Sequence, residues 1–78
     1  MPWILCAHYI LTLDNSRSSF IFDLRVLDAA NNLYTLRSID PHDNVALVQK
    51  ILRMMADRWP SFTIQVQVDA RGTITDVQ

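Results

Sequence analysis

Two aspartates, Asp14 and Asp69, are the residues whose type and position first point to chemistry. Each follows directly after a run of alternating apolar residues, the pattern of a β-strand. If the two strands are parallel neighbours, both carboxylates lie at one edge of a sheet, where paired acids hold a divalent cation, with Asp28 or Asp43 as a third ligand. The simpler alternative, which we prefer, is that each aspartate forms the turn that ends its strand.

Cys6 and His8 are a second candidate, because period-two alternation places them on one face of the first strand. Together with His42 they are too few for a structural zinc site, which takes four ligands at short paired spacings. A Cys–His nucleophilic pair needs hydrogen-bond contact, whereas same-face neighbours on a strand lie roughly 6–7 Å apart. We therefore predict a buried, unreactive Cys6, no metal site, no cofactor and no enzymatic activity.

Arg25 and Arg37 are predicted on adjacent strands of one hairpin, on the same side as Asp23. This arrangement is typical of cross-strand ion pairs on a solvated surface. It also fits polar anchors in a protein–protein interface, where arginine is enriched. A third interpretation is nucleic-acid binding by a dimer that pools its basic residues, namely Arg17, Arg25, Arg37 and Lys50. Against it, the aromatic residues of these strands fall on the other side, which leaves no surface for base stacking.

The composition limits these alternatives. The 78-residue chain is 50% hydrophobic and has a formal net charge of −1, so it lacks the basic surface by which most nucleic-acid-binding proteins neutralise phosphates. Its single cysteine excludes an internal disulfide and indicates a reducing compartment. The apolar N-terminal stretch has no basic segment before it and is too short to span a membrane, so we expect a cytoplasmic protein.

The apolar spacing predicts one domain, residues 1–78, with the element order β-β-β-α-β-β. The expected strands cover 3–13, 20–28, 33–39, 61–68 and 73–77. An amphipathic helix is expected over 41–58, with Asp40 as its N-cap and Pro41 at its first position. Trp59 ends this helix, because a residue that precedes proline avoids the helical region. Gly72 is expected to take a left-handed conformation in the last hairpin turn.

The order of the elements also predicts how the strands are arranged. Three strands in a meander, followed by a right-handed crossover through the helix, give the sheet order 3-2-1-4-5 with the fourth strand parallel to the first. The fold class is then α+β, a mixed five-stranded sheet with one amphipathic helix on one face. This order resembles the first half of a ribonuclease-H-like or integrase core, and the resemblance implies a metal-dependent nuclease-like remnant that uses Asp14 and Asp69. It covers the order of elements, and no family is assigned from it.

One helix can cover only one side of such a sheet, and the other side stays apolar over the first three strands. The candidate interface on that side consists of Ile4, His8, Ile10, Ile21, Arg25, Leu33, Arg37 and Ile39. Monomers rarely expose a large contiguous apolar patch, and two-fold dimers are the commonest oligomers. We therefore predict a non-enzymatic protein-binding module of the adaptor or inhibitor type, which forms a homodimer through this surface and does not associate with membranes.

Overall fold

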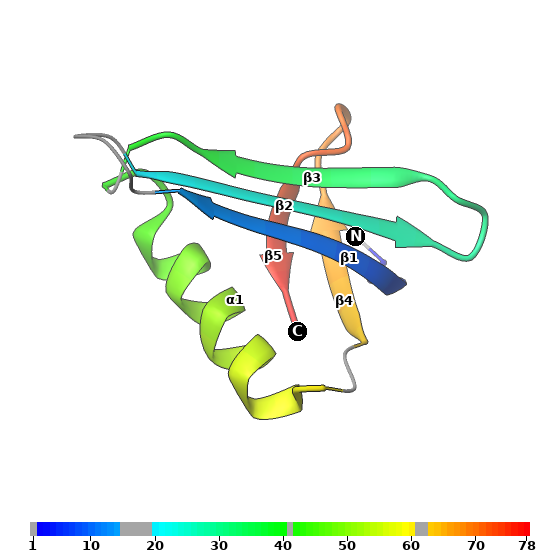
Figure 1. Ribbon diagram of the computed structural model, residues 1–78. Coiled ribbons are helices and arrows are strands. Elements are labelled where there is room, and N and C mark those ends of the chain that lie inside the picture. The colour runs from blue at the N-terminus through cyan, green and yellow to red at the C-terminus, as the bar shows by residue number, and fades with distance from the viewer. Residues whose placement is uncertain (1, 15–19, 41, 61–62) are drawn as a thin grey trace.

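The computed structural model describes residues 2–14, 20–40, 42–60 and 63–78, and these form a small α+β fold (Figure 1). The elements follow the predicted order, namely β1 (Ile4–Asp14), β2 (Ile21–Asp28), β3 (Leu33–Ser38), α1 (Val45–Arg58), β4 (Ile64–Val68) and β5 (Ile74–Val77). Within the described residues, no helix has both the length and the apolar character needed to cross a membrane.

The strand order is β3-β2-β1-β4-β5, as predicted, but the expected mixed sheet is wrong in its strand directions. All four pairs of named strands are antiparallel, β1 with β4 included. β1 pairs with β4 over Ile4–Cys6 and with β2 over Cys6–Asp14. The strands therefore make two three-stranded arrays that share β1, and Figure 1 shows β4 and β5 running across the direction of β1, β2 and β3.

A β-bulge in β1 lies where the two arrays meet. In the ladder with β2, Cys6 pairs with Asp28 and His8 pairs with Leu27, so Ala7 is an extra residue. A bulge bends its strand and reverses the inward and outward alternation beyond it. The bend gives the first residues of β1 a direction of their own, along which β4 pairs antiparallel. The array of β1, β4 and β5 therefore lies at an angle to β2 and β3.

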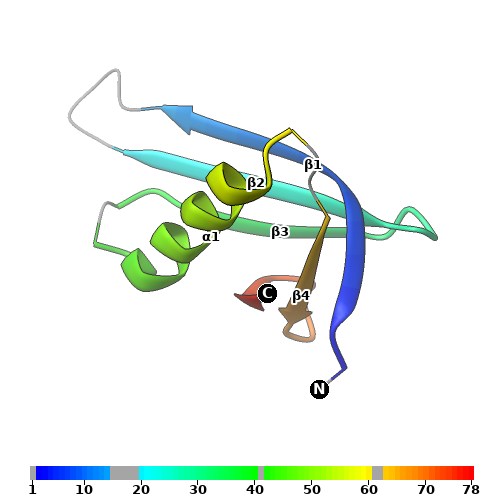
Figure 2. The ribbon, with the colours of Figure 1, turned by 90° about the horizontal axis from the view of Figure 1, so that it is seen from below.

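The core lies between the two arrays and α1. Phe22, Leu24 and Val26 of β2 are completely buried, and they belong to one cluster with Val48 and Ile51 of α1. Burial of an aliphatic or aromatic side chain of this size contributes about 1.5–3 kcal/mol to folding. Figure 2 shows α1 and β4 on the same side of the layer formed by β1, β2 and β3. The opposite side of that layer is not covered by either of them.

The helix begins four residues later than predicted. The Asp40 carboxylate accepts the backbone N–H of His42 at 2.8 Å, and the Asp40 carbonyl accepts that of Asp43 at 2.9 Å, so this segment forms a turn. The buried Ser38 hydroxyl donates to the carbonyls of Asp40 and Asp43 at 3.0 and 3.1 Å. Asn44, with φ of 53°, then leads into α1. The predicted end of the helix before Trp59 is confirmed.

The turn between β2 and β3 and the turn between β4 and β5 each depend on an aspartate. The Asp28 carboxylate accepts two backbone N–H bonds of 2.9 Å and the Tyr34 hydroxyl at 2.9 Å. These bonds, the backbone N–H of Asn32 foremost, hold the pKa of Asp28 below its ordinary value. In the second turn the Asp69 carboxylate accepts two backbone N–H bonds of 2.8 and 3.0 Å. Gly72 has a φ of 78°, which confirms the predicted left-handed glycine.

Candidate functional site

We call the side of β1, β2 and β3 that points away from α1 the outer face. The strand register arranges its side chains in four rows: His8, Leu27 and Leu33; Ile10, Arg25 and Thr35; Thr12, Asp23 and Arg37; and Asp14 and Ile21, with Ile39 directly after β3. Each end row holds two aliphatic side chains, and the two middle rows hold Asp23 and both arginines. The outer face therefore has aliphatic side chains beside His8 and Asp14 in its end rows, and both charged side chains and Ile10 in its middle rows.

Large aliphatic side chains on the outer face are open to solvent. Ile10 is 65% exposed, Leu33 54% and Ile39 60%. On the inner side of the same strands, Leu24 and Leu36 are buried. Since apolar surface is stabilised by about 25 cal/mol for each Å² removed from water, this exposure leaves a driving force for association unused in the single chain.

The charges at the centre of the outer face alternate in sign. Arg25 lies with its Nη2 atom 3.5 Å from Oδ2 of Asp23, and Arg37 is the register partner of Asp23 across the hairpin. An exposed ion pair of this length contributes little to stability, because water screens it. Its main consequence is a pattern of charge, with a carboxylate between two guanidinium groups, on a surface that holds both aliphatic and polar side chains.

The structure places most of the predicted interface residues on the outer face. Those exposed there are His8, Ile10, Arg25, Leu33, Arg37 and Ile39, and Ile21 is half-buried on the same side. The prediction was wrong for Ile4, which packs against the buried cluster on the inner side. Leu5, which the simple alternation puts under the helix, is exposed instead. Both differences have one cause, the extra residue of the bulge, which shifts the alternation in β1 by one position.

The same bulge separates Cys6 from His8, so their predicted position on one face is wrong. Cys6 is buried on the inner side, whereas His8 is exposed on the outer face. Burial raises the pKa of the Cys6 thiol, and the negative charge of Asp28, its register partner, raises it further. A thiol with a raised pKa stays protonated at neutral pH and is a weak nucleophile. The predicted burial of Cys6 is confirmed.

Asp14 and Asp69 do not form the paired site that the resemblance to a ribonuclease-H-like core implies. Asp14 is the last residue of β1. Because β4 runs antiparallel to β1, Asp69 follows β4 beyond the opposite end of β1. Its carboxylate is engaged with backbone N–H groups of its own turn. Among the described residues, no group of three or more His, Cys, Asp or Glu side chains could hold a metal ion.

The basic residues proposed to bind nucleic acid do not share one surface. Arg25 and Arg37 lie on the outer face, whereas Lys50 lies on α1 and donates to Oδ1 of Asp76 at 3.0 Å. This bond is the largest cause of the lowered pKa of Asp76. Arg17 falls outside the described residues. The described cations are therefore divided between the two sides of the molecule.

An apolar hollow of about 480 Å³ between β1 and α1 was not predicted from the sequence. Its walls are formed by Tyr9, Leu11, Met55, Ala56 and Trp59. The sequence predicted only that the helix ends at Trp59, and this residue is 71% exposed. Pro60 is the sequence feature from which the exposure of Trp59 could have been predicted, because it ends α1 and leaves the indole beyond the last helical turn.

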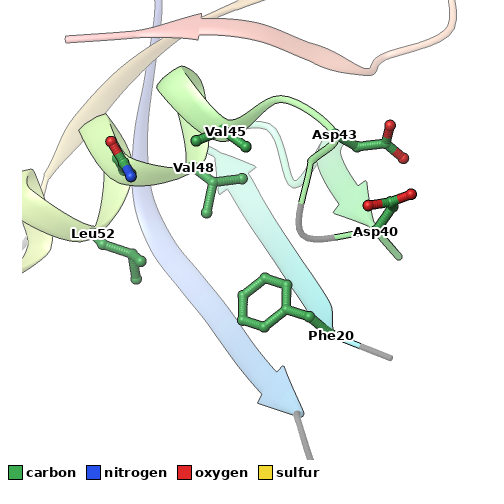
Figure 3. A pocket seen from close by; sticks show the side chains of 7 residues that line it. Phe20, Asp40, Asp43, Val45, Val48 and Leu52 are labelled. Atoms are coloured by element: carbon green, nitrogen blue, oxygen red, sulfur yellow. The ribbon is translucent and has the colours of Figure 1, made fainter. Parts of the chain in front are cut away.

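A smaller hollow of about 190 Å³ lies beside the first turn of α1 (Figure 3). Phe20, Val48 and Leu52 form its apolar wall, and the carboxylates of Asp40 and Asp43 lie together at one side, apart from that wall. Asp40 is already engaged with the backbone of its own turn. This hollow is therefore a product of the turn that precedes the helix, and the outer face remains the stronger candidate site.

Comparisons with models of protein families, with curated proteins and with solved structures found no match for this chain. Function is therefore inferred from the surfaces of the chain alone. The outer face offers three strongly exposed aliphatic residues on a hydrogen-bonded sheet. The hollow beside Trp59 has exposed Ala56 and Trp59 above half-buried Tyr9 and Leu11 and buried Met55.

Proposed function

We propose that this chain is a small, non-enzymatic protein-binding module that forms a homodimer through its outer face. The observation that carries the proposal is the exposure of Ile10, Leu33 and Ile39 on the side of the sheet opposite α1. A single copy gains nothing from these side chains in water, whereas a second copy that covers them removes apolar surface from both molecules.

The chemistry of the outer face supports this proposal. Interfaces are rich in arginine and poor in lysine and glutamate, and the described charges of the outer face come from arginine and aspartate. The side chains are also held on strands whose register is fixed on both sides of β2. Association therefore orders little additional backbone, which lowers the entropic cost of binding.

A module of this kind acts by occupying the surface of another protein, as adaptors and inhibitors do. The second copy is the occupant that we propose, because dimers with two-fold symmetry need one self-complementary surface and no further component. The buried Cys6 thiol supports a reducing compartment, and we propose the cytoplasm.

Sedimentation velocity over a range of concentrations tests the proposal. We expect the native chain to shift from its 9.0 kDa monomer towards twice that mass as the concentration rises. Ile10→Asp and Leu33→Asp should abolish the shift, because each places a charge in the apolar contact. Val45→Asp is the matched control, since Val45 is a partly exposed aliphatic residue on α1, on the other side of the molecule.

The proposal fails if the native chain remains a monomer at the highest concentration, or if the two outer-face variants unfold as judged by circular dichroism. Retention on heparin that falls steeply with added salt would instead favour nucleic-acid binding through Arg25 and Arg37.

A further inference from the structure

We propose that the second half of β1 is a docking edge for an extended segment of another protein, which adds a strand there and places an apolar side chain in the hollow beside Trp59. This goes beyond the homodimer, because it uses the edge and the inner side of the sheet. β1 pairs with β4 over Ile4–Cys6 and with β2 over Cys6–Asp14. Beyond Cys6, one side of β1 therefore faces no described strand, and Figure 2 shows this part of β1 at the margin of its layer.

The strand register determines which backbone groups point to that open side. The N–H of Thr35 donates to a carbonyl of the turn between β4 and β5 at 3.1 Å, so the backbone groups of Thr35 point away from β2. Because these groups alternate in an antiparallel ladder, Arg25, the register partner of Thr35, bonds with Ile10 of β1. Leu11 and Leu13 then direct each N–H and C=O to the open side, where no described residue bonds to them.

The other two edges of the sheet are partly occupied. The turn between β4 and β5 lies against the edge of β3, where Gly72 accepts the N–H of Thr35. At the edge of β5, the N–H of Val77 donates to the carboxylate of Asp76 at 2.8 Å. Lys50 donates to the same carboxylate oxygen at 3.0 Å. Among the described strands, the second half of β1 is therefore the edge with the least protection.

The sequence of this open edge favours strand pairing. Tyr9–Leu13 consists of aromatic, aliphatic and β-branched residues, which prefer β-strands. Natural edge strands often carry a charged side chain or a proline that prevents pairing with another chain, and this segment contains neither. Leu13, the register partner of buried Phe22, is itself 50% exposed. A further strand beside β1 therefore satisfies its backbone groups and covers apolar surface.

The hollow beside Trp59 indicates what the added strand carries. Tyr9 and Leu11 of β1 form one wall of this hollow of about 480 Å³, and its described walls include no charged residue. Ala56 and Trp59 on α1 are exposed, so the hollow is too open to enclose a small molecule, which needs most of its surface buried. A peptide is bound by the backbone of the edge as well, and it requires from the hollow a place for one apolar side chain.

The register also predicts the pattern of the partner segment. Antiparallel pairing, the more stable kind, sets one residue of the segment opposite Leu11 and another opposite Leu13. The side chain opposite Leu11 lies on the inner side at the hollow, so we expect a large apolar residue there. Asp14, exposed at the end of β1, favours a basic residue opposite it. The partner is therefore an extended segment with apolar side chains at alternate positions and a lysine or arginine near its N-terminal end.

A peptide of this pattern tests the proposal. In acetylated and amidated Thr-Lys-Val-Thr-Phe-Thr-Val, the phenylalanine is designed to lie opposite Leu11. We expect binding by isothermal titration calorimetry, and protection of the Leu11 and Leu13 amides from hydrogen exchange measured by NMR. N-methylation of the phenylalanine nitrogen removes a hydrogen bond to β1 and should raise the Kd about tenfold. N-methylation of the preceding threonine is the matched control, because its N–H points away from β1, and should change the Kd less than about threefold.

Two exposed alanines of α1 give a matched pair of protein variants. Ala56→Arg places a large side chain in the hollow and should raise the Kd of the peptide about tenfold or more. Ala46→Arg adds the same side chain at a position that does not line this hollow, and should leave the Kd unchanged. Circular dichroism verifies that both variants keep the fold.

Three results would overturn the proposal. The first is the absence of binding at about 1 mM peptide, which is the weak end of specific recognition. The second is binding that leaves the amides of Leu11 and Leu13 unprotected. The third is protection of these amides when the chain is concentrated without peptide, because the edge then pairs with a second copy. Leu33→Asp, which removes the proposed homodimer, should still bind the peptide, so the failures of the two proposals are distinguishable.

Discussion

The two sides of β2 show how one strand serves two purposes. Leu24 is completely buried among core side chains, while its neighbour Arg25 points into solvent on the outer face. The same alternation continues into β3, where buried Ser38 follows exposed Arg37. The inner side stabilises the fold, whereas the outer side contributes little to that stability. Substitutions along these strands should therefore alternate in effect from one residue to the next.

Leu24→Ala should give the largest difference between the two sides. Truncation of a completely buried leucine removes packing and leaves a cavity, so the free energy of unfolding should fall by about 3 kcal/mol. Arg25→Ala should change it by less than about 0.5 kcal/mol. Urea denaturation followed by circular dichroism measures both. If Leu24→Ala does not fold, Leu24→Val gives a smaller loss, and equal losses at the two positions would refute the comparison.

Ser38→Ala should have an intermediate effect. The Ser38 hydroxyl donates to the carbonyls of Asp40 and Asp43, and its loss leaves those carbonyls without this buried donor. The expected decrease in the free energy of unfolding is about 1–2 kcal/mol. Arg37→Ala is the matched control on the outer side, and a decrease as large as that of Ser38→Ala would show that the two sides are not distinct.

Asp28→Asn should have the smallest effect, visible in the pH dependence of stability. The pKa of Asp28 is lowered in the folded chain, so the ionised carboxylate stabilises the fold above the unfolded pKa of about 3.9, and this contribution is lost as the pH falls through the folded pKa. The melting temperature of the native chain should therefore decrease as the pH falls below about 5, and that of Asp28→Asn should decrease less. Asp76, whose pKa is also lowered, accounts for part of the remaining slope. Identical slopes would mean that the turn contributes nothing to acid sensitivity.

β2 and β1 differ in how well their sequences predict them. In β2 the alternation is unbroken, and the inward positions of Phe22 and Leu24 follow from it directly. In β1 apolar residues stand on both sides of the bulge, so the shift at Ala7 leaves no mark in the hydrophobic pattern. A bulge is stabilised by pairing with other strands, and neighbouring residues alone do not specify it. The wrong assignments of Ile4, Leu5 and Cys6 all result from that shift.

The predicted direction of β4 and the predicted start of α1 were both wrong, and the reasons are related. Sequence periodicity identifies a strand but does not say which way it runs beside a partner that is distant in the chain, so Asp14 and Asp69 could not be placed together or apart. Asp40 can bond a following backbone N–H either as a helix cap or in a turn. The buried Ser38 hydroxyl, a tertiary contact, stabilises the turn.

The pairing of Ile4–Cys6 with β4 joins segments from opposite ends of the chain. On the ribosome, β1, β2 and β3 emerge first and can form hairpins from neighbouring residues, whereas the beginning of β1 must wait until β4 has been synthesised. During that interval α1, β4 and β5 do not yet cover Phe22 and Leu24, so the nascent sheet is apolar on both sides. The pairing of β1 with β4 is therefore a long-range contact, which forms more slowly than the local hairpins.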